Sequence, residues 1–176
     1  MVENQNQSNP STLLQKEFDK TRNLFVFLVH LVHQVALYAE IEAKQRASKN
    51  LPNQADLSVN TKLAGNSIVW QTLEAEKFKK AISLVHPEQW VDKEMVKTLF
   101  RNLSESSIYK TYIEEPTRDK SKEKEILKYI LGTLILESDA MIEYIDERFM
   151  NWEDEGEMMV DFMLNYLQKP GSVNFL

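Results

Sequence analysis

The chain has 176 residues, which is enough for one domain with a substantial core and too few for two ordinary domains. Hydrophobic residues make up 43%, while only four Gly and five Pro leave few positions for the turns of a sheet protein. The net charge is -6, and the absence of Cys excludes disulfide scaffolds, thiolate zinc sites and cysteine nucleophiles. We therefore expect an all-α fold.

The first eleven residues are polar and show no hydrophobic period, which predicts a disordered lead-in over residues 1–11. A single helical domain is expected over residues 12–176. The start of the chain lacks the positive and apolar regions of a secretory signal. We therefore expect a cytoplasmic protein that makes no contact with a membrane.

A long helix is predicted from Thr12 to about Lys49, because Thr12 and Gln15 stand at capping-box spacing and nothing downstream breaks a helix. The stretch Leu24 to Val32 is apolar on all sides except at His30, which indicates a central helix buried on several sides. That stretch is shorter than the ~20 apolar residues that span a bilayer. The predicted apolar seam of the helix consists of Leu14, Phe18, Thr21, Phe25, Leu28, Val32, Val35 and Ala39.

Residues 50–66 are rich in turn formers and are predicted to be the one long irregular connection. Within them Leu51, Leu57 and Leu63 are expected to anchor the segment to the core. Helical patterning resumes near Ser67 and pauses at His86-Pro87, where proline removes a backbone donor.

The second half of the chain partly repeats itself. Lys93–Lys97 matches Lys124–Lys128 at an offset of 31, and later matches follow at an offset of 32. A third partial copy begins at Trp152, which corresponds to Trp90. Duplication would give stacked helical hairpins with a repeat of about 31 residues, whereas chance similarity between amphipathic helices is the alternative. Both tryptophans are expected to pack in the core rather than to form exposed stacking platforms.

Charge is distributed unevenly. Residues 137–161 hold ten carboxylates and a single cation, Arg148. Because phosphate neutralisation supplies most nucleic-acid affinity, this stretch should not contact RNA or DNA. It is instead a candidate docking face for a basic protein, formed by Glu143, Asp146, Glu147, Asp154, Glu157 and Asp161.

The densest positive clusters lie upstream of the acidic stretch. The second of them is interleaved with acids, which predicts a mixed polar loop leading into a helix and extending to Lys124 and Lys128. The candidate phosphate contacts are Lys77, Lys79, Lys80, Arg118, Lys120 and Lys122.

Catalytic and metal-binding motifs are weak. His30 and His33 could share a metal, but no Glu-x-x-His pair accompanies them, so packing roles are favoured and neither a metal nor another cofactor is expected. Glu143 and Glu147 could act as paired acids, although such a charged helix face is more often solvated. Without a phosphate loop or an activated nucleophile, the sequence predicts a protein that is not an enzyme.

Several segments resemble one family. They are Leu13-Leu14-Gln15-Lys16 followed by Asp19-Lys20-Thr21, the loop Leu51-Pro52 with Asp56-Leu57 and Asn60-Thr61-Lys62, and the tryptophans at 90 and 152. Together they are similar to the extended form of the bacterial transcription antitermination protein NusB, in which a large helical segment precedes the standard carboxy-terminal part. The resemblance covers roughly residues 12–176, and its most specific stretch is the loop.

This resemblance implies an all-helical fold and a partnership with NusE, a ribosomal protein, on the boxA element of ribosomal RNA leaders. Two departures limit it. The chain has only Met1 to Pro10 where the family has an arginine-rich RNA-contacting helix, and it stops at Leu176 before the carboxy-terminal helices, as expected of a fragment or abbreviated relative. No RNA-contact residue of the family can be placed here. The alternative function is a helical docking scaffold without an RNA role.

Overall fold

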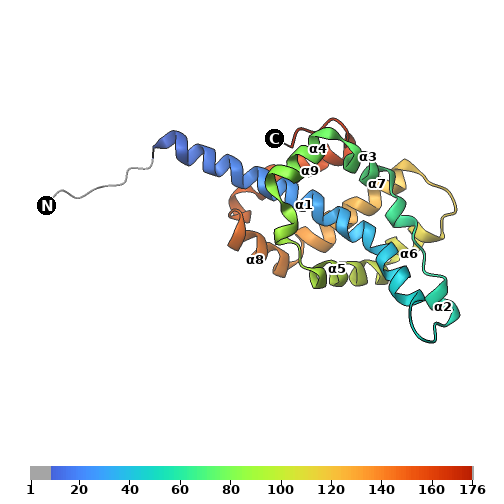
Figure 1. The fold of residues 1–176 in the computed structure, drawn as a ribbon. Coiled ribbons are helices and arrows are strands. Elements are labelled where there is room, and N and C mark those ends of the chain that lie inside the picture. Colours follow the sequence, from blue (N-terminus) through green and yellow to red (C-terminus); the bar gives the residue numbers. More distant parts are fainter. Residues whose placement is uncertain (1–8, 176) are drawn as a thin grey trace.

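The computed structural model describes residues 9–175, which contain nine α-helices and no strand, so the all-α prediction is confirmed (Figure 1). The predicted lead-in lies outside the described residues up to residue 8. The α-helices are α1 (Pro10–Ala47), α2 (Gln54–Leu57), α3 (Ser67–Glu74), α4 (Glu76–Val85), α5 (Lys93–Glu105), α6 (Ser107–Glu114), α7 (Lys120–Tyr129), α8 (Asp139–Arg148) and α9 (Trp152–Gln168). Three short helices join them, η1 (Lys62–Gly65), η2 (Pro87–Trp90) and the π-helical η3 (Ile130–Leu136).

The helix α1 begins two residues before the predicted Thr12. The side chain of Asn9 accepts a hydrogen bond from the backbone N–H of Ser11, and Pro10 occupies the first helical position, where its missing N–H costs nothing. The expected Thr12 capping box was therefore wrong, because a better cap stands just upstream. The other end lies close to the predicted Lys49, with Ser48 as the capping residue.

The middle of α1 is the rod on which the other helices pack. It contacts α4, α5 and α9 and all three short helices. From Leu24 to Val32 every residue is buried except the half-buried His30, as predicted. By length and composition, α1 is the one helix within residues 9–175 that could cross a membrane, and 72% of its most apolar stretch is buried inside the protein.

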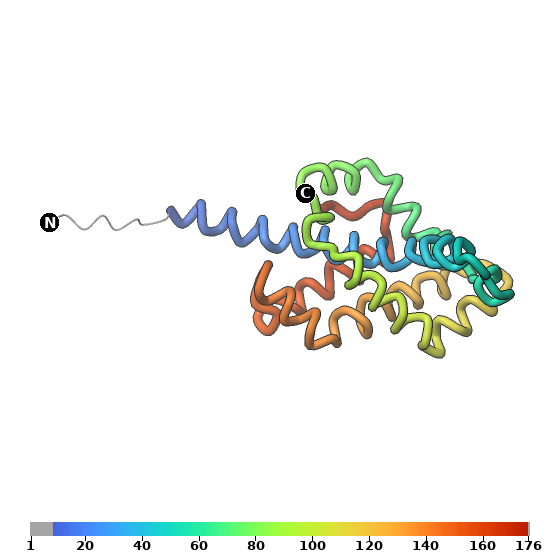
Figure 2. Tube along the Cα trace, turned by 60° about the horizontal axis from the view of Figure 1, so that its bottom comes forward, coloured from blue at the N-terminus to red at the C-terminus, as the bar shows by residue number. Residues whose placement is uncertain are grey.

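The first turns of α1 project from the body of the molecule (Figure 2). The predicted seam is buried from Phe25 onward, whereas Leu14 and Phe18 are exposed. The predicted seam therefore continues uncovered over these first turns, where α9 borders Phe18 only across an open groove.

The connection after α1 is held by polar groups and by one buried leucine. Leu63 is fully buried, but Leu51 and Leu57 are exposed, so two of the three predicted anchors were wrong. A capping box between Asn53 and Asp56 fixes α2 instead, and the Asp56 carboxylate accepts from Lys49 at 2.7 Å. These bonds satisfy backbone groups that a leucine could not.

A lysine fastens the same connection to α6. The Lys62 ammonium donates to the carbonyl oxygens of Tyr112 at 2.7 Å and of Glu115 at 2.6 Å. It also lies 4.6 Å from the centroid of the Tyr112 ring, a cation–π distance. The segment is thus tied to the carboxyl end of α6.

Two successive helical hairpins form the second half of the fold, α5 with α6 and then α7 and η3 with α8. Buried positions correspond between them, Val96 with Leu127 at the offset of 31 and Tyr109 with Met141 at the offset of 32. The offset changes across η3, and a π-helical turn accommodates one extra residue in a helix. The change of the repeat offset from 31 to 32 residues therefore coincides with the π-helix η3.

The two tryptophans that the repeat aligns are half-buried and pack against the core. The Trp90 ring meets Phe149 edge-on, with centroids 5.0 Å apart. Trp152 opens α9 and covers Gly156, where a Cβ atom would come within 2.7 Å of the indole. Packing roles are thus confirmed for both.

Candidate interaction surfaces

A lysine groove lies between the amino ends of α3 and α7 and the segment that follows α9. It encloses about 760 Å³, and no carboxylate is among its lining residues. None of the ion pairs within residues 9–175 uses its three lysines. The lining residues are Ser67, Ile68, Gln71, Lys120, Ser121, Lys124, Leu167, Gln168, Lys169, Pro170, Gly171 and Ser172.

A buried glutamate brings the two helix ends together. Glu123, in the first turn of α7, is 1% exposed and accepts from the backbone N–H of Ser67 at 3.1 Å and from the Ser67 hydroxyl. The Arg118 guanidinium donates to the same carboxylate at 2.7 Å. A buried carboxylate is tolerated only with such partners. The bonds from Ser67 to Glu123 hold the first turn of α7 beside α3. Lys120 and Lys124 flank Glu123 and are therefore held there with it.

Side-chain caps order the groove walls. The buried Asn66 accepts from the N–H of Ile68 at 3.0 Å and donates to the Glu123 carbonyl at 3.0 Å. Asp119 accepts from the N–H of Ser121 at 2.7 Å. Both helices thus begin at the groove, with their first N–H groups held by Asn66, Asp119 and Glu123, so the positive charge of the groove comes from its lysines. The groove can bind an anionic group such as a phosphate.

The structure divides the predicted basic residues into four groups. Lys120 lines the lysine groove, and Lys122 is exposed on α7 outside it. Arg118 is committed to the fold, because it also donates to the Lys62 carbonyl at 3.1 Å. The fourth group is exposed on α4 and consists of Lys77, Lys79 and Lys80, of which Lys79 pairs with Glu76 at 3.1 Å.

The groove contains a residue that sequence reasoning missed. Lys169 follows α9 and is far along the chain from Lys120 and Lys124. It has no basic neighbour in sequence, so no local pattern signals it. Contacts of α7 with α3 and with α9 bring the three lysines to one place.

The predicted acidic face lies on α8 and α9, and all six of its carboxylate residues are exposed. Two have local structural roles. Asp146 accepts from the backbone N–H of Trp152 at 2.7 Å, and Asp154 accepts from the side chain of Asn151 at 2.9 Å. Glu147 pairs with Arg148 at 3.1 Å. Glu143, Glu157 and Asp161 form none of the described ion pairs.

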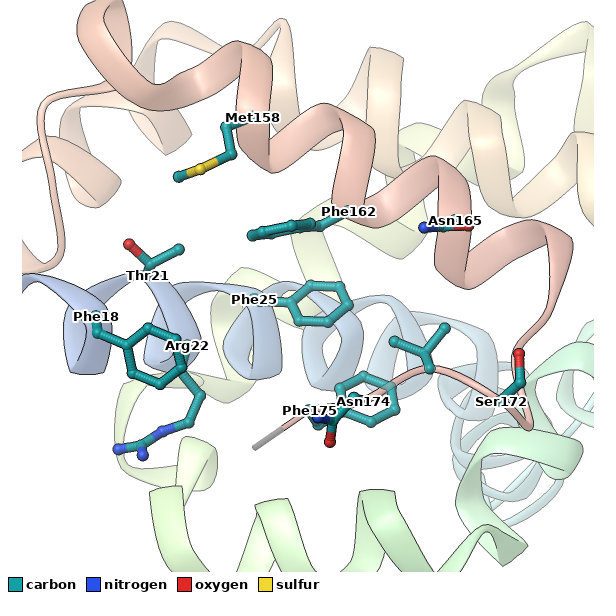
Figure 3. A pocket seen from close by; sticks show the side chains of 11 residues that line it. Phe18, Thr21, Arg22, Phe25, Met158, Phe162, Asn165, Ser172, Asn174 and Phe175 are labelled. Carbon is teal, nitrogen blue, oxygen red and sulfur yellow. The ribbon is translucent and has the colours of Figure 1, made fainter.

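An apolar groove adjoins that face. It encloses about 510 Å³ between the first half of α1, α9 and the terminal residues 172–175. Figure 3 shows Phe18 and Phe25 from α1 on one wall and Met158 and Phe162 from α9 on the other. Phe25 stacks on Phe175 at 5.1 Å between centroids, which closes the base of the groove. The shape suits an apolar side chain from a partner.

The two histidines that could have shared a metal have different surroundings. His33 is fully buried, and its Nε2 lies 2.8 Å from the hydroxyl of Tyr166. Burial lowers the pKa of His33 to about 3, so the ring is neutral. His30 is half-buried, and burial lowers its pKa as well. Within residues 9–175 no group of three or more His, Asp or Glu side chains is placed to hold a metal ion.

The chain matches no protein family, no curated protein and no solved structure with which it was compared. The interaction surfaces described above therefore stand on their own geometry.

Proposed function

We propose that this chain is a non-catalytic helical factor that binds RNA in transcription antitermination or ribosomal RNA processing, as its resemblance to NusB implies. The observation that carries the proposal is the lysine groove. Lys120, Lys124 and Lys169 line it without a carboxylate, in a protein whose net charge is -6. A locally positive groove on an acidic protein is suited to the phosphates of a nucleic acid.

The acidic stretch of the sequence does not oppose this assignment directly. The six predicted docking carboxylates lie on α8 and α9 from Glu143 to Asp161, and none of them lines the groove. The proposed partners are those of the resembled family, a NusE-like ribosomal protein and a boxA-type RNA. The proposed setting is the cytoplasm, where transcripts are made.

A gel-shift titration of a leader RNA tests the proposal, with and without NusE. The change is the triple variant Lys120→Gln, Lys124→Gln and Lys169→Gln. Because each neutralised phosphate contributes ~0.7 to the salt slope on single strands, the variant should bind more weakly and lose about 2 from that slope. Unchanged RNA affinity when the chain is added to NusE would count against a direct role.

A second triple variant serves as the matched control. Lys77→Gln, Lys79→Gln and Lys80→Gln removes the same charge from α4, outside the lysine groove. A smaller loss than in the groove variant is expected. Equal losses would mean that overall charge, rather than the groove, determines RNA affinity.

A second function is favoured by a separate observation, the apolar groove beside the exposed carboxylates of α9. We propose as the alternative that this region binds a basic amphipathic helix of a protein partner, with apolar residues in the groove and cations on Glu157 and Asp161. Pull-down at low and high salt tests it. A partner retained equally at both salt concentrations would remove the electrostatic part of the argument.

A further inference from the structure

A second cationic cavity lies toward the carboxyl end of α1, apart from the lysine groove. It encloses about 370 Å³ between α1, α5 and α6, with α2 and the residues that follow it along one side. In Figure 1, α2, α5 and α6 gather around this end of α1. We call this cavity the arginine pocket. Its lining includes one acid, Glu42, and three cations, Arg46, Lys97 and Arg101.

Three aromatic residues line the same pocket. The rings of Tyr38 and Phe100 lie 5.2 Å apart between centroids, and those of Phe100 and Tyr109 lie 6.0 Å apart. All three residues are buried, so packing already holds their rings and a ligand that contacts them costs little further ordering. No aromatic residue is among those that line the lysine groove. The arginine pocket therefore suits an apolar ring in addition to a charge.

Two tyrosine hydroxyls of the pocket are open to a ligand. Within residues 9–175 the hydroxyls of Tyr38 and Tyr109 form no hydrogen bond, although the two residues are only 7% and 4% exposed. Neither hydroxyl is fully enclosed as that of Tyr112 is, so both retain a path to solvent. Burial raises the pKa of Tyr109 to about 12, so its hydroxyl keeps the proton and can donate it in a hydrogen bond.

The two arginines of the pocket also have donors to spare. Arg101 is exposed and forms none of the ion pairs within residues 9–175. Arg46 pairs with Glu42 through Nε, at 2.7 Å, and its two terminal nitrogens form no further bond among the described residues. A guanidinium presents paired N–H groups that match the two oxygens of a carboxylate. An acid group is thus the natural complement of these side chains.

We propose that the arginine pocket binds a small aromatic carboxylate. Its ring lies along the three aromatic side chains, and its carboxylate lies between Arg46 and Arg101. The volume of the pocket is within the range of small-molecule sites, roughly 300–1,000 Å³, and suits a ligand of one or two rings. This site goes beyond the proposed RNA-binding function and does not depend on it.

An amide NMR titration of the full chain with 2-naphthoate tests the proposal. A dissociation constant of about 1 mM or lower is expected for a ligand of this size. The amide signals of Phe100, Arg101 and Tyr109 should shift. 2-Naphthamide keeps the rings without the charge, and acetate keeps the charge without the rings, so each should bind at least ~10-fold more weakly. Equal affinity for either compound, or shifts confined to the apolar groove around Phe18 and Phe162, would overturn the proposal.

Three variants locate the ligand. Arg101→Gln removes a guanidinium that supports no described bond, and it should weaken 2-naphthoate binding by roughly tenfold or more. Tyr38→Phe keeps the ring and removes one open hydroxyl, for which a loss of roughly fivefold is expected. Lys110→Gln is the matched control, because Lys110 is exposed on α6 outside the pocket, and it should bind as the wild type does.

The thermal midpoint of each variant shows whether the fold is intact. Wild-type affinity of Arg101→Gln for 2-naphthoate, or an equal loss in Lys110→Gln, would overturn the proposal. The variant that replaces Lys120, Lys124 and Lys169 by Gln should bind 2-naphthoate as the wild type does. A failed RNA titration and a failed naphthoate titration would therefore be separate results.

Discussion

The two halves of α1 carry the same apolar pattern and have different environments. Leu14 and Phe18 continue the three-and-four spacing of Phe25 and Leu28. The first pair is exposed, 74% and 55%, whereas the second pair is buried. The pattern shows which residues share a face of a helix, and the presence of a neighbouring element determines whether that face is covered.

The difference also separates two physical roles for one helix. Between Leu24 and Ala39 the helix is surrounded by others, so its side chains contribute to the stability of the whole domain. Over the first turns the side chains of Leu14 and Phe18 remain available to a partner, and Phe18 leads into the apolar groove. Contiguous exposed apolar patches, rather than single apolar residues, are typical of docking surfaces.

The largest expected effect comes from the buried half. Leu28 is fully buried, so Leu28→Ala removes its transfer free energy and leaves a cavity, which should lower the free energy of unfolding by about 2–5 kcal/mol. Urea denaturation followed by circular dichroism measures it. A loss below about 1 kcal/mol would show that the middle of α1 is not the packed centre described here.

The protonation of His33 is expected to come second. Its pKa is about 3 in the folded protein and 6.5 in the unfolded chain. Above pH 6.5 the ring is neutral in both states, so its contribution to stability is fully present there. As the pH falls from 6.5 toward 3, the unfolded chain binds a proton that the folded protein does not, and stability is lost at about 1.4 kcal/mol per pH unit.

His33→Gln isolates this effect, because an amide can still hydrogen bond to Tyr166 but does not titrate in this range. Between pH 7.5 and pH 5 the wild type should lose about 2 kcal/mol more than the variant, measured by urea denaturation at each pH. His30 and the acids are common to both proteins, so their contributions cancel. Parallel pH profiles would contradict the buried neutral histidine.

A smaller effect is expected at the carboxyl end of α1, where a polar loop holds the chain. Asn53 caps α2 by accepting from the N–H of Asp56 at 2.8 Å. Asn53→Ala should lower the free energy of unfolding by about 1 kcal/mol, the usual cost of losing such a cap. Hydrogen exchange should accelerate in α2 and leave Leu24 to Val32 protected. An unchanged exchange rate in α2 would show that the cap does not hold this end.

The smallest effect is expected in the exposed half. Leu14→Ala is the matched control for Leu28→Ala, and because the side chain is 74% exposed it should change the free energy of unfolding by no more than about 0.5 kcal/mol. The same denaturation experiment measures it. A loss close to that of Leu28→Ala would mean that something covers the first turns in solution.

Much of the fold followed from local patterns. Helix boundaries near Ser67 and at His86-Pro87 were predicted from capping and proline chemistry, which act over a few residues. The Thr12 start failed because a stronger cap stood upstream at Asn9. Leu51 and Leu57 failed because an apolar residue is buried only where another element covers it.

The candidate sites could be predicted only in part. Lys120 was predicted because it belongs to a linear cluster of basic residues. Arg118 belongs to the same cluster and was predicted with it, but its guanidinium pairs with the buried Glu123. Charge alone does not reveal such a pairing. Lys169 was missed, because it belongs to no motif. Its place in the groove depends on the packing of α7 against α3 and α9.

The helical class and the buried stretch Leu24 to Val32 can be predicted from the amino-acid order, because both depend on backbone preferences and on apolar spacing within one helix. Only the packed fold reveals that Lys120, Lys124 and Lys169 line one groove and that the first turns of α1 stay uncovered. Those arrangements arise from contacts between residues far apart in the chain, such as Ser67 with Glu123, and no local pattern encodes them.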